Sequence, residues 1–169
     1  LWNKLINKKL YKIPDCRSIE GLNYAEDFHL TTRLYYYADK IVKIDTPFYH
    51  YNKTNENAIT HKKNQMHFEE AILFWQLLEQ FFKKNNIYEK YFDLIEFHKV
   101  QSKLNLIIES HSHKLRKQYA YLYRDIEMKY FSQFRFGEKI ILFCTHYRLF
   151  LLVRIARNLL VFKNKKIKK

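Results

Sequence analysis

Glycine, proline and cysteine are scarce in this chain of 169 residues, which has two of each. Average usage is about 7% Gly and 5% Pro, so the chain has few residues suited to tight turns, and long helices are favoured. Gly21 and Gly137 stand too far apart to form a glycine-rich phosphate loop, which excludes a P-loop and a dinucleotide fingerprint. The isolated cysteines, Cys16 and Cys144, indicate a reduced, cytosolic protein without a disulfide framework.

Acidic residues are also in the minority, because 17 Asp and Glu face 31 Lys and Arg and leave a net charge of +14. The hydrophobic share of 47% lies in the usual globular range, so the chain can still bury the core of about one domain. The charge points to an anionic partner, either nucleic acid or a membrane surface. The chain starts at Leu1 and has its first methionine at Met66, and we interpret it as a fragment of a longer protein.

Residues 1–64 and 65–169 differ in pattern and are predicted to be separate regions. In the first, apolar residues between Glu26 and Asp39 follow helical spacing, and the runs 41–45 and 48–51 have the β-branched or aromatic composition of short strands. Residues 52–63 are polar and aperiodic, which predicts a loop. The fold class expected from this pattern is mostly α with a small β element.

The second region is predicted to be helical near residues 65–84, 88–110, 113–132 and 138–163. The first of these has the strongest apolar spacing, and breaks are predicted at 85–86, 111–113 and 136–137.

The segment 140–162 is long enough to cross a bilayer but contains several arginines, each costing about 2.5–3.5 kcal/mol at the membrane centre, so we do not expect it to span. Treated as one helix, the segment places basic side chains opposite an aliphatic face. With the lysine-rich tail 163–169, this pattern predicts peripheral binding to an anionic membrane surface. A bundle helix with a solvated basic face is the alternative.

Three motifs occur in order in the first region: residues 1–5 read LWNKL, residues 21–27 read GLNYAED, and residues 38–51 read ADKIVKIDTPFYHY. Together they resemble the C-terminal part of bacterial family 2 glycosyltransferases of the GT-A fold, over about residues 1–62. The resemblance implies that residues 1–64 are the acceptor-side end of a GT-A α/β catalytic domain and that residues 65–169 are a helical extension.

The same resemblance implies an inverting transfer of a sugar from a nucleotide-sugar donor to a surface-polysaccharide or lipid-linked glycan acceptor. The enzyme would work in the cytoplasm, peripherally at the inner face of the cell membrane. Such enzymes use a divalent metal, Mg or Mn, held by an Asp-x-Asp motif that does not occur in these 169 residues. We therefore expect the metal ligands and the donor site to lie upstream, and the isolated fragment to be inactive.

The family's general base falls on Asp27 by this resemblance, and Glu26 would orient the loop or bind the acceptor. A positioned base removes the proton from the attacking hydroxyl and typically contributes about 10²–10⁴-fold to the rate. The alternative is that either carboxylate caps the helix that begins there.

Trp2, Asn3 and Lys4 are candidates for the acceptor pocket, with an indole face for a sugar and polar groups beside it. Lys53 and His61 are candidates for contacts with the departing diphosphate, whose charge they would offset. The alternatives are local packing for the first three and a solvated loop for the last two.

Two other classes of function compete with the enzyme: a basic helical module that binds nucleic acid, and a membrane-surface adaptor without catalysis. The chain has 14 Tyr and 14 Phe interleaved with lysines, as in some nucleic-acid-binding surfaces. No recognised nucleic-acid-binding motif accompanies them, so we expect these rings to pack between helices instead.

Overall fold

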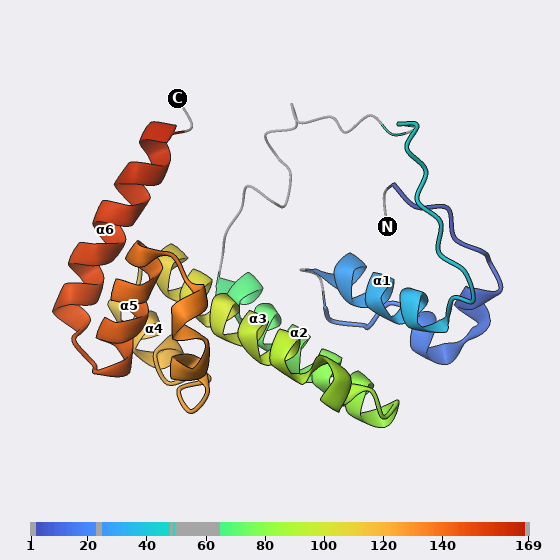
Figure 1. Ribbon diagram of the computed structural model, residues 1–169, viewed down its shortest axis with the longest axis horizontal. Helices are drawn as coiled ribbons and strands as arrows, with labels where there is room; N and C mark the ends of the chain where they lie inside the picture. Colours follow the sequence, from blue (N-terminus) through green and yellow to red (C-terminus); the bar gives the residue numbers. More distant parts are fainter. Residues whose placement is uncertain (1–2, 23–24, 48, 50–64, 168–169) are drawn as a thin grey trace. The chain divides into compact units, whose positions relative to one another are not determined.

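The computed structural model describes residues 3–22, 25–47, 49 and 65–167. The chain divides into two compact units, Leu1–Phe81 and Phe82–Lys169, called here the N-terminal and C-terminal units. The elements follow one another in the order η1 (Leu10–Lys12), η2 (Pro14–Cys16), α1 (Glu26–Tyr37), α2 (Gln65–Lys84), α3 (Tyr88–Glu109), α4 (His113–Tyr119), η4 (Glu127–Gln133), α5 (Phe136–His146) and α6 (Phe150–Ile167) (Figure 1).

The fold class is mostly α, because the described residues form helices, turns and coil but no strand. The expectation of a small β element, and of part of a GT-A α/β domain, is therefore wrong. Residues 41–45 are exposed coil, and Phe48 and residues 50–51 lie outside the described residues. A strand requires a neighbour for its backbone N–H and C=O groups, and no described segment forms a ladder with residues 41–45.

Three of the predicted helices are confirmed, namely α1, α2 and α3. The break between α2 and α3 falls at Asn86, whose φ of 55° lies in the left-handed region that asparagine tolerates. The break before α4 is fixed by Ser112, whose hydroxyl accepts a hydrogen bond from the Leu115 N–H at 3.3 Å. A serine at this position satisfies one of the free N–H groups at a helix start.

The helix predicted over 113–132 is wrong beyond Tyr119, where α4 ends. In a longer helix the Ala120 carbonyl would accept from a backbone N–H further along the chain, but here it accepts from Lys103 Nζ at 2.8 Å. Glu127, at the start of η4, is fully buried and also pairs with Lys103. A tertiary contact with α3 therefore overrides the local helical preference of this segment.

The helix predicted over 138–163 is two helices, α5 and α6, joined by a turn at Arg148. Arg148 has a φ of 61°, and the Leu149 N–H donates back to the Cys144 carbonyl at 2.7 Å, as at many helix C-termini. Glycine is the usual residue in this conformation, so the arginine gave no signal for the turn.

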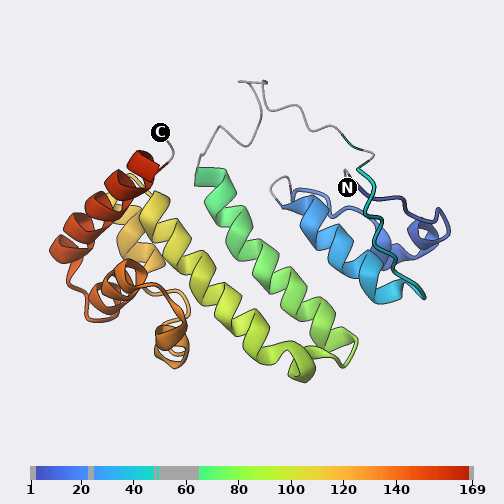
Figure 2. The ribbon, with the colours of Figure 1, turned by 45° about the horizontal axis from the view of Figure 1, so that its top comes forward.

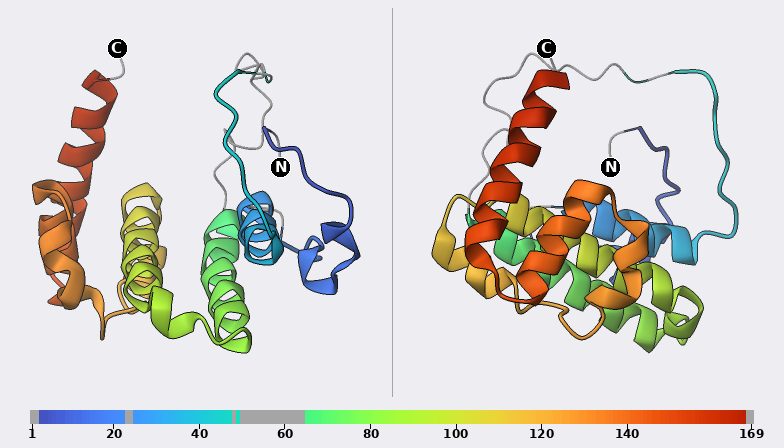
Figure 3. Two further views of the ribbon diagram at one scale, coloured as in Figure 1. Left: turned by 45° about the vertical axis from the view of Figure 1, so that its right-hand side comes forward. Right: turned by 60° about the vertical axis from the view of Figure 1, so that its left-hand side comes forward.

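The two helices α5 and α6 pack side by side as a hairpin (Figures 2 and 3). They run in opposite directions, because Gly137 near the start of α5 meets Leu160 near the end of α6. A Cβ on Gly137 would lie only 2.8 Å from the Leu160 Cδ1. None of the helices that the structure describes is both long and apolar enough to cross a lipid bilayer.

The core of the N-terminal unit joins α1 to the residues before it. Cys16, Leu30 and Leu34 form its buried centre, and partly buried apolar side chains from residues 6–13 pack against them. The Tyr37 hydroxyl donates to Asp15 Oδ2 at 2.8 Å, and this hydrogen bond raises the pKa of Tyr37 to about 12. These contacts fix η2 against α1.

His29 is buried in the same unit, against the edge of the Phe74 ring. Within the described residues neither of its ring nitrogens has a hydrogen-bond partner. Burial, reinforced by the positive charge of Arg33, lowers the pKa of His29 from 6.5 to about 4. The folded unit therefore holds this ring neutral.

Stability of the N-terminal unit is expected to fall as the pH drops from about 6.5 to about 4, because the unfolded chain binds a proton that buried His29 does not. The neutral His29 ring contributes about 3 kcal/mol to the free energy of unfolding of this unit. This contribution is fully present above pH 6.5 and is lost near pH 4. Both tryptophans, Trp2 and Trp75, belong to this unit, so urea unfolding followed by their fluorescence measures it. His29→Leu should remove the fall in the free energy of unfolding between these two pH values, whereas His113→Gln, at an exposed histidine, should leave it unchanged. The same pH dependence in both variants would contradict the prediction.

The C-terminal unit is built around α3, which packs against α4, η4 and α5. Its buried residues include Val100 and Leu104 together with the charged Lys103, so apolar and polar residues do not separate onto two faces. Helix α6 is attached through buried Val153 and through Arg157, whose Nε donates to the Ile108 carbonyl at 2.5 Å. Arg157, which the single-helix prediction placed on the basic face, therefore binds the end of α3.

Candidate functional site

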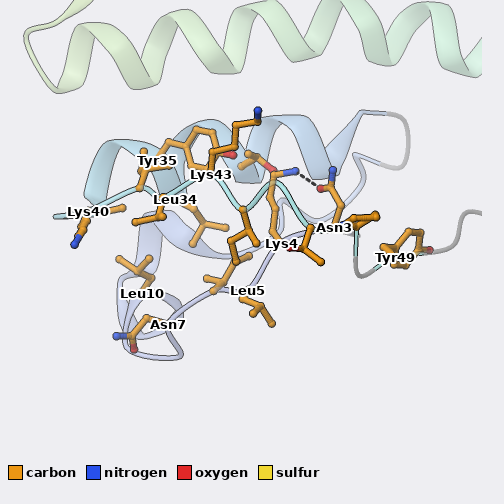
Figure 4. Close-up of a pocket in the computed structure, with 18 residues that line it drawn as sticks. Asn3, Lys4, Leu5, Asn7, Leu10, Leu34, Tyr35, Lys40, Lys43 and Tyr49 are labelled. Atoms are coloured by element: carbon orange, nitrogen blue, oxygen red, sulfur yellow. Dashed lines mark hydrogen bonds between the residues drawn. The ribbon is translucent and has the colours of Figure 1, made fainter.

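The N-terminal unit contains a groove of about 950 Å³. Its walls come from residues 3–10, from one face of α1, from residues 38–47 and from Tyr49 (Figure 4). The groove is thus lined by residues of the first and third motifs noted in the sequence, whereas no described residue of the second motif, 21–27, lines it.

The helical wall of the groove is a single face of α1. Thr31, Leu34 and Ala38 line the groove and are spaced three or four residues apart, which places them on one side of the helix. Asp27 lies one turn before Thr31 on the same face, and the Thr31 hydroxyl donates to the Asp27 carbonyl at 2.6 Å. Asp27 therefore belongs to the first turn of the helix that forms the wall, and its carboxylate is not among the groups that line the groove.

The charged groups that line the groove are all positive: Lys4, Lys40 and Lys43, with no Asp or Glu among its described lining residues. Lys4 Nζ donates to Asn3 Oδ1 at 2.8 Å, and this pair lies toward the end of the groove opposite Lys40 (Figure 4). Lys43 forms an exposed ion pair with Asp45 at 2.6 Å. Three ammonium groups on one concave surface favour a ligand with an anionic group.

Half of the lining is apolar. Ile6, Leu10 and Leu34 continue the core into the floor, whereas Leu5 and Ile41 expose their side chains. Apolar walls with a few convergent polar groups are the usual composition of a small-molecule site. The combination with three lysines suits an amphipathic anion, with a phosphate or carboxylate at one end and a hydrocarbon chain at the other.

The two predicted acidic residues stand at the start of α1. Glu26 is its first residue and is exposed, and half-buried Asp27 accepts a hydrogen bond from the Phe28 N–H at 2.7 Å through Oδ1. The N-cap position itself is Ala25, with a φ of 63° and no side-chain cap. Asp27 thus satisfies one free N–H of the helix start, a role that is compatible with proton transfer at the groove.

Of the five other predicted site residues, the groove contains two, Asn3 and Lys4. Trp2, Lys53 and His61 lie outside the described residues.

Lys40, Lys43 and Tyr35 line the groove but were not predicted as site residues. Lys40 and Lys43 interrupt the apolar run of the third motif, and this interruption is the sequence signal that could have identified them as site residues. Tyr35 follows Thr31 by four residues on the helical wall. Among the residues that the structure describes, no group of three His, Cys, Asp or Glu side chains is placed to hold a metal ion.

Comparisons with protein-family models, with curated proteins and with solved structures found no match to this chain.

Proposed function

We propose that this chain supplies the acceptor side of a glycosyltransferase, which transfers a sugar with inversion from a nucleotide-sugar to a lipid-linked glycan acceptor. One observation carries the proposal: residues of the first and third motifs of the glycosyltransferase resemblance line the same groove, and the helix that starts at the end of the second motif forms one of its walls. The lining favours a lipid-linked acceptor over a free polysaccharide, because it combines apolar walls with three lysines.

In this proposal Lys4 binds the acceptor's phosphate, and Leu5 and Ile41 contact the hydrocarbon. The acceptor hydroxyl is held near the start of α1, where Glu26 helps to orient it. Asp27 takes the hydroxyl proton as the oxygen bonds to the anomeric carbon, and the bond from that carbon to the nucleoside diphosphate breaks. The described residues offer no cluster for the divalent metal that the resemblance implies, so we assign it no ligand in this chain.

We also propose that the protein works peripherally at the inner face of the cell membrane. A lipid-linked acceptor is held in the bilayer, and residues 139–169 carry nine Lys and Arg and no Asp or Glu. Each basic residue close to an anionic lipid surface contributes about 1 kcal/mol to binding.

Lys4→Gln is expected to lower kcat/KM for a lipid-phosphate acceptor by about tenfold, through KM rather than kcat, because the lysine binds the acceptor without taking part in the bond change. The assay uses the full-length protein in membranes, a polyprenyl-phosphate-linked sugar as acceptor and release of nucleoside diphosphate from a panel of nucleotide-sugars. Lys12→Gln is the matched control, because Lys12 is an exposed lysine of the same unit that does not line the groove.

Absence of nucleoside diphosphate release with every donor would contradict the transferase proposal. Equal KM values for Lys4→Gln and Lys12→Gln would show that the acceptor does not bind in this groove.

A further inference from the structure

The α5–α6 hairpin has two exposed apolar stripes. On α5 and its C-cap, Phe136, Ile140, Phe143 and Tyr147 recur every three or four residues, and on α6 Leu152, Ile155 and Leu159 do the same. The exposed fraction reaches 81% for Phe136 and 67% for Leu159, so these are not edges of the core. The stripe on α5 was not predicted, because residues 138–163 were expected to form one helix.

Both stripes lie on the same side of the hairpin. Each residue turns an α-helix by about 100°, and each stripe is centred about a quarter of a turn from the residue that meets the other helix, Gly137 on α5 and Leu160 on α6. When each helix is viewed along its own chain direction, its stripe lies on the same side of this contact residue in both cases. Because the helices run in opposite directions, equal rotation brings the two stripes to a common face, which we call the hairpin face.

The charges of the hairpin and of the tail after it are mostly positive. Residues 136–169 contain nine Lys and Arg and one acidic residue, Glu138. Arg148, in the turn between the helices, is exposed, and so is Arg154, on the side of α6 away from the stripe. A second copy of the chain would bring two such cationic segments together with few acidic partners, and like-charge juxtaposition at an interface is costly. Anionic lipid instead offers hydrocarbon for the stripes and negative headgroups for the arginines and lysines.

We propose that the hairpin face inserts into the boundary between headgroups and acyl chains of an anionic membrane, with both helices parallel to the surface. The inference deepens the peripheral membrane association proposed above and rests on it, but it does not depend on the transfer reaction. An in-plane helix of this kind buries its apolar face by about 5–10 Å. Val153 and Arg157 hold the other side of α6 to the unit, so the hairpin inserts without unfolding.

The test uses exposed positions, because removing α6 would also remove buried Val153 from the unit. Binding of the chain is measured on vesicles of phosphatidylglycerol mixed with phosphatidylcholine and on vesicles of phosphatidylcholine alone. We expect binding to the anionic vesicles, weakened about tenfold by Phe136→Ser and again by Leu159→Ser. Leu94→Ser, at an exposed leucine of α3 in the same unit, is the matched control and should not change binding.

Each contrary result has a separate meaning. Unchanged vesicle binding in Phe136→Ser and Leu159→Ser would overturn insertion while leaving a purely electrostatic peripheral association. No binding to anionic vesicles would overturn both membrane proposals, but not the transferase assay. A wild-type dimer in sedimentation that Phe136→Ser converts to a monomer would assign the hairpin face to a second copy. Binding to single-stranded RNA that Leu159→Ser weakens as much as vesicle binding would overturn the choice of lipid.

Discussion

Replacing Glu127 with Gln is expected to lower the free energy of unfolding of the C-terminal unit by about 3–5 kcal/mol. Glu127 is fully buried, pairs with the equally buried Lys103 through Oε2, and contacts His146 Nδ1 at 2.5 Å through Oε1. The amide carries no charge, so Lys103 would lose its counterion in a place that water does not reach. The pKa of Lys103 is already lowered by burial, and Glu127 is the main influence that opposes this.

A double variant distinguishes the effect of this ion pair on stability from the effect of side-chain packing. The double variant Lys103→Met, Glu127→Met replaces both charges with apolar groups of similar size, and His146 is partly exposed and can bind water instead. We expect the double variant to be more stable than Glu127→Gln, because a removed pair costs less than a buried unpaired charge.

Urea unfolding followed by far-UV circular dichroism reports the helices of both units, whereas tryptophan fluorescence follows only the N-terminal unit, since residues 82–169 contain no tryptophan. The unfolding transition that circular dichroism shows and fluorescence does not is that of the C-terminal unit. Glu89→Gln, at an exposed glutamate of α3, is the control and should change stability by less than about 0.5 kcal/mol. A loss below about 1 kcal/mol in Glu127→Gln would show that the buried pair is not what holds η4 to α3.

Asp27→Asn in the full-length protein is expected to lower kcat by about 10²–10⁴-fold while donor binding is unchanged. The asparagine side-chain oxygen can still accept from the Phe28 N–H, the bond that Asp27 makes at 2.7 Å, so the start of α1 should be preserved. What the amide loses is the ability to take a proton from the acceptor hydroxyl. The substitution therefore distinguishes catalysis from helix capping.

The measurement is release of nucleoside diphosphate at saturating acceptor, with donor binding measured separately. Asp125→Asn, at an exposed aspartate of the C-terminal unit, is the control for a lost negative charge. A kcat for Asp27→Asn close to that of Asp125→Asn would leave Asp27 as a helix-start residue only.

The helices were predictable where local signals and tertiary packing agree. The regular apolar spacing in α2, the asparagines after it and Ser112 before α4 all have local causes that a sequence displays. Residues 120–132 were not predictable, because the Ala120 carbonyl and Glu127 are bound by Lys103 from a distant part of the chain. The β signals of residues 41–45 were misleading, since composition indicates a preference for extended backbone but not the presence of a pairing partner.

The candidate site was predictable in part. Residues of the first and third motifs, among them Asn3 and Lys4, line the groove, and that these residues bind an acceptor stays a prediction. Lys40 and Lys43 were missed because a lysine in an apolar run is equally typical of a solvated strand edge, and only the three-dimensional arrangement shows which surface it borders. The roles of Asp27 and Glu26 rest on the resemblance, and the Asp27→Asn experiment tests the first of them.

The exposed coil at residues 41–45 also has a consequence for handling the protein. An extended segment with exposed Ile41, Val42 and Ile44 is a template onto which another chain can add a strand, as at an unprotected sheet edge. The Lys43–Asp45 ion pair places charges within this run, a feature that opposes such pairing. Concentrated solutions of the chain should begin to aggregate at this segment, and conditions that weaken the exposed ion pair, such as high salt, should hasten aggregation.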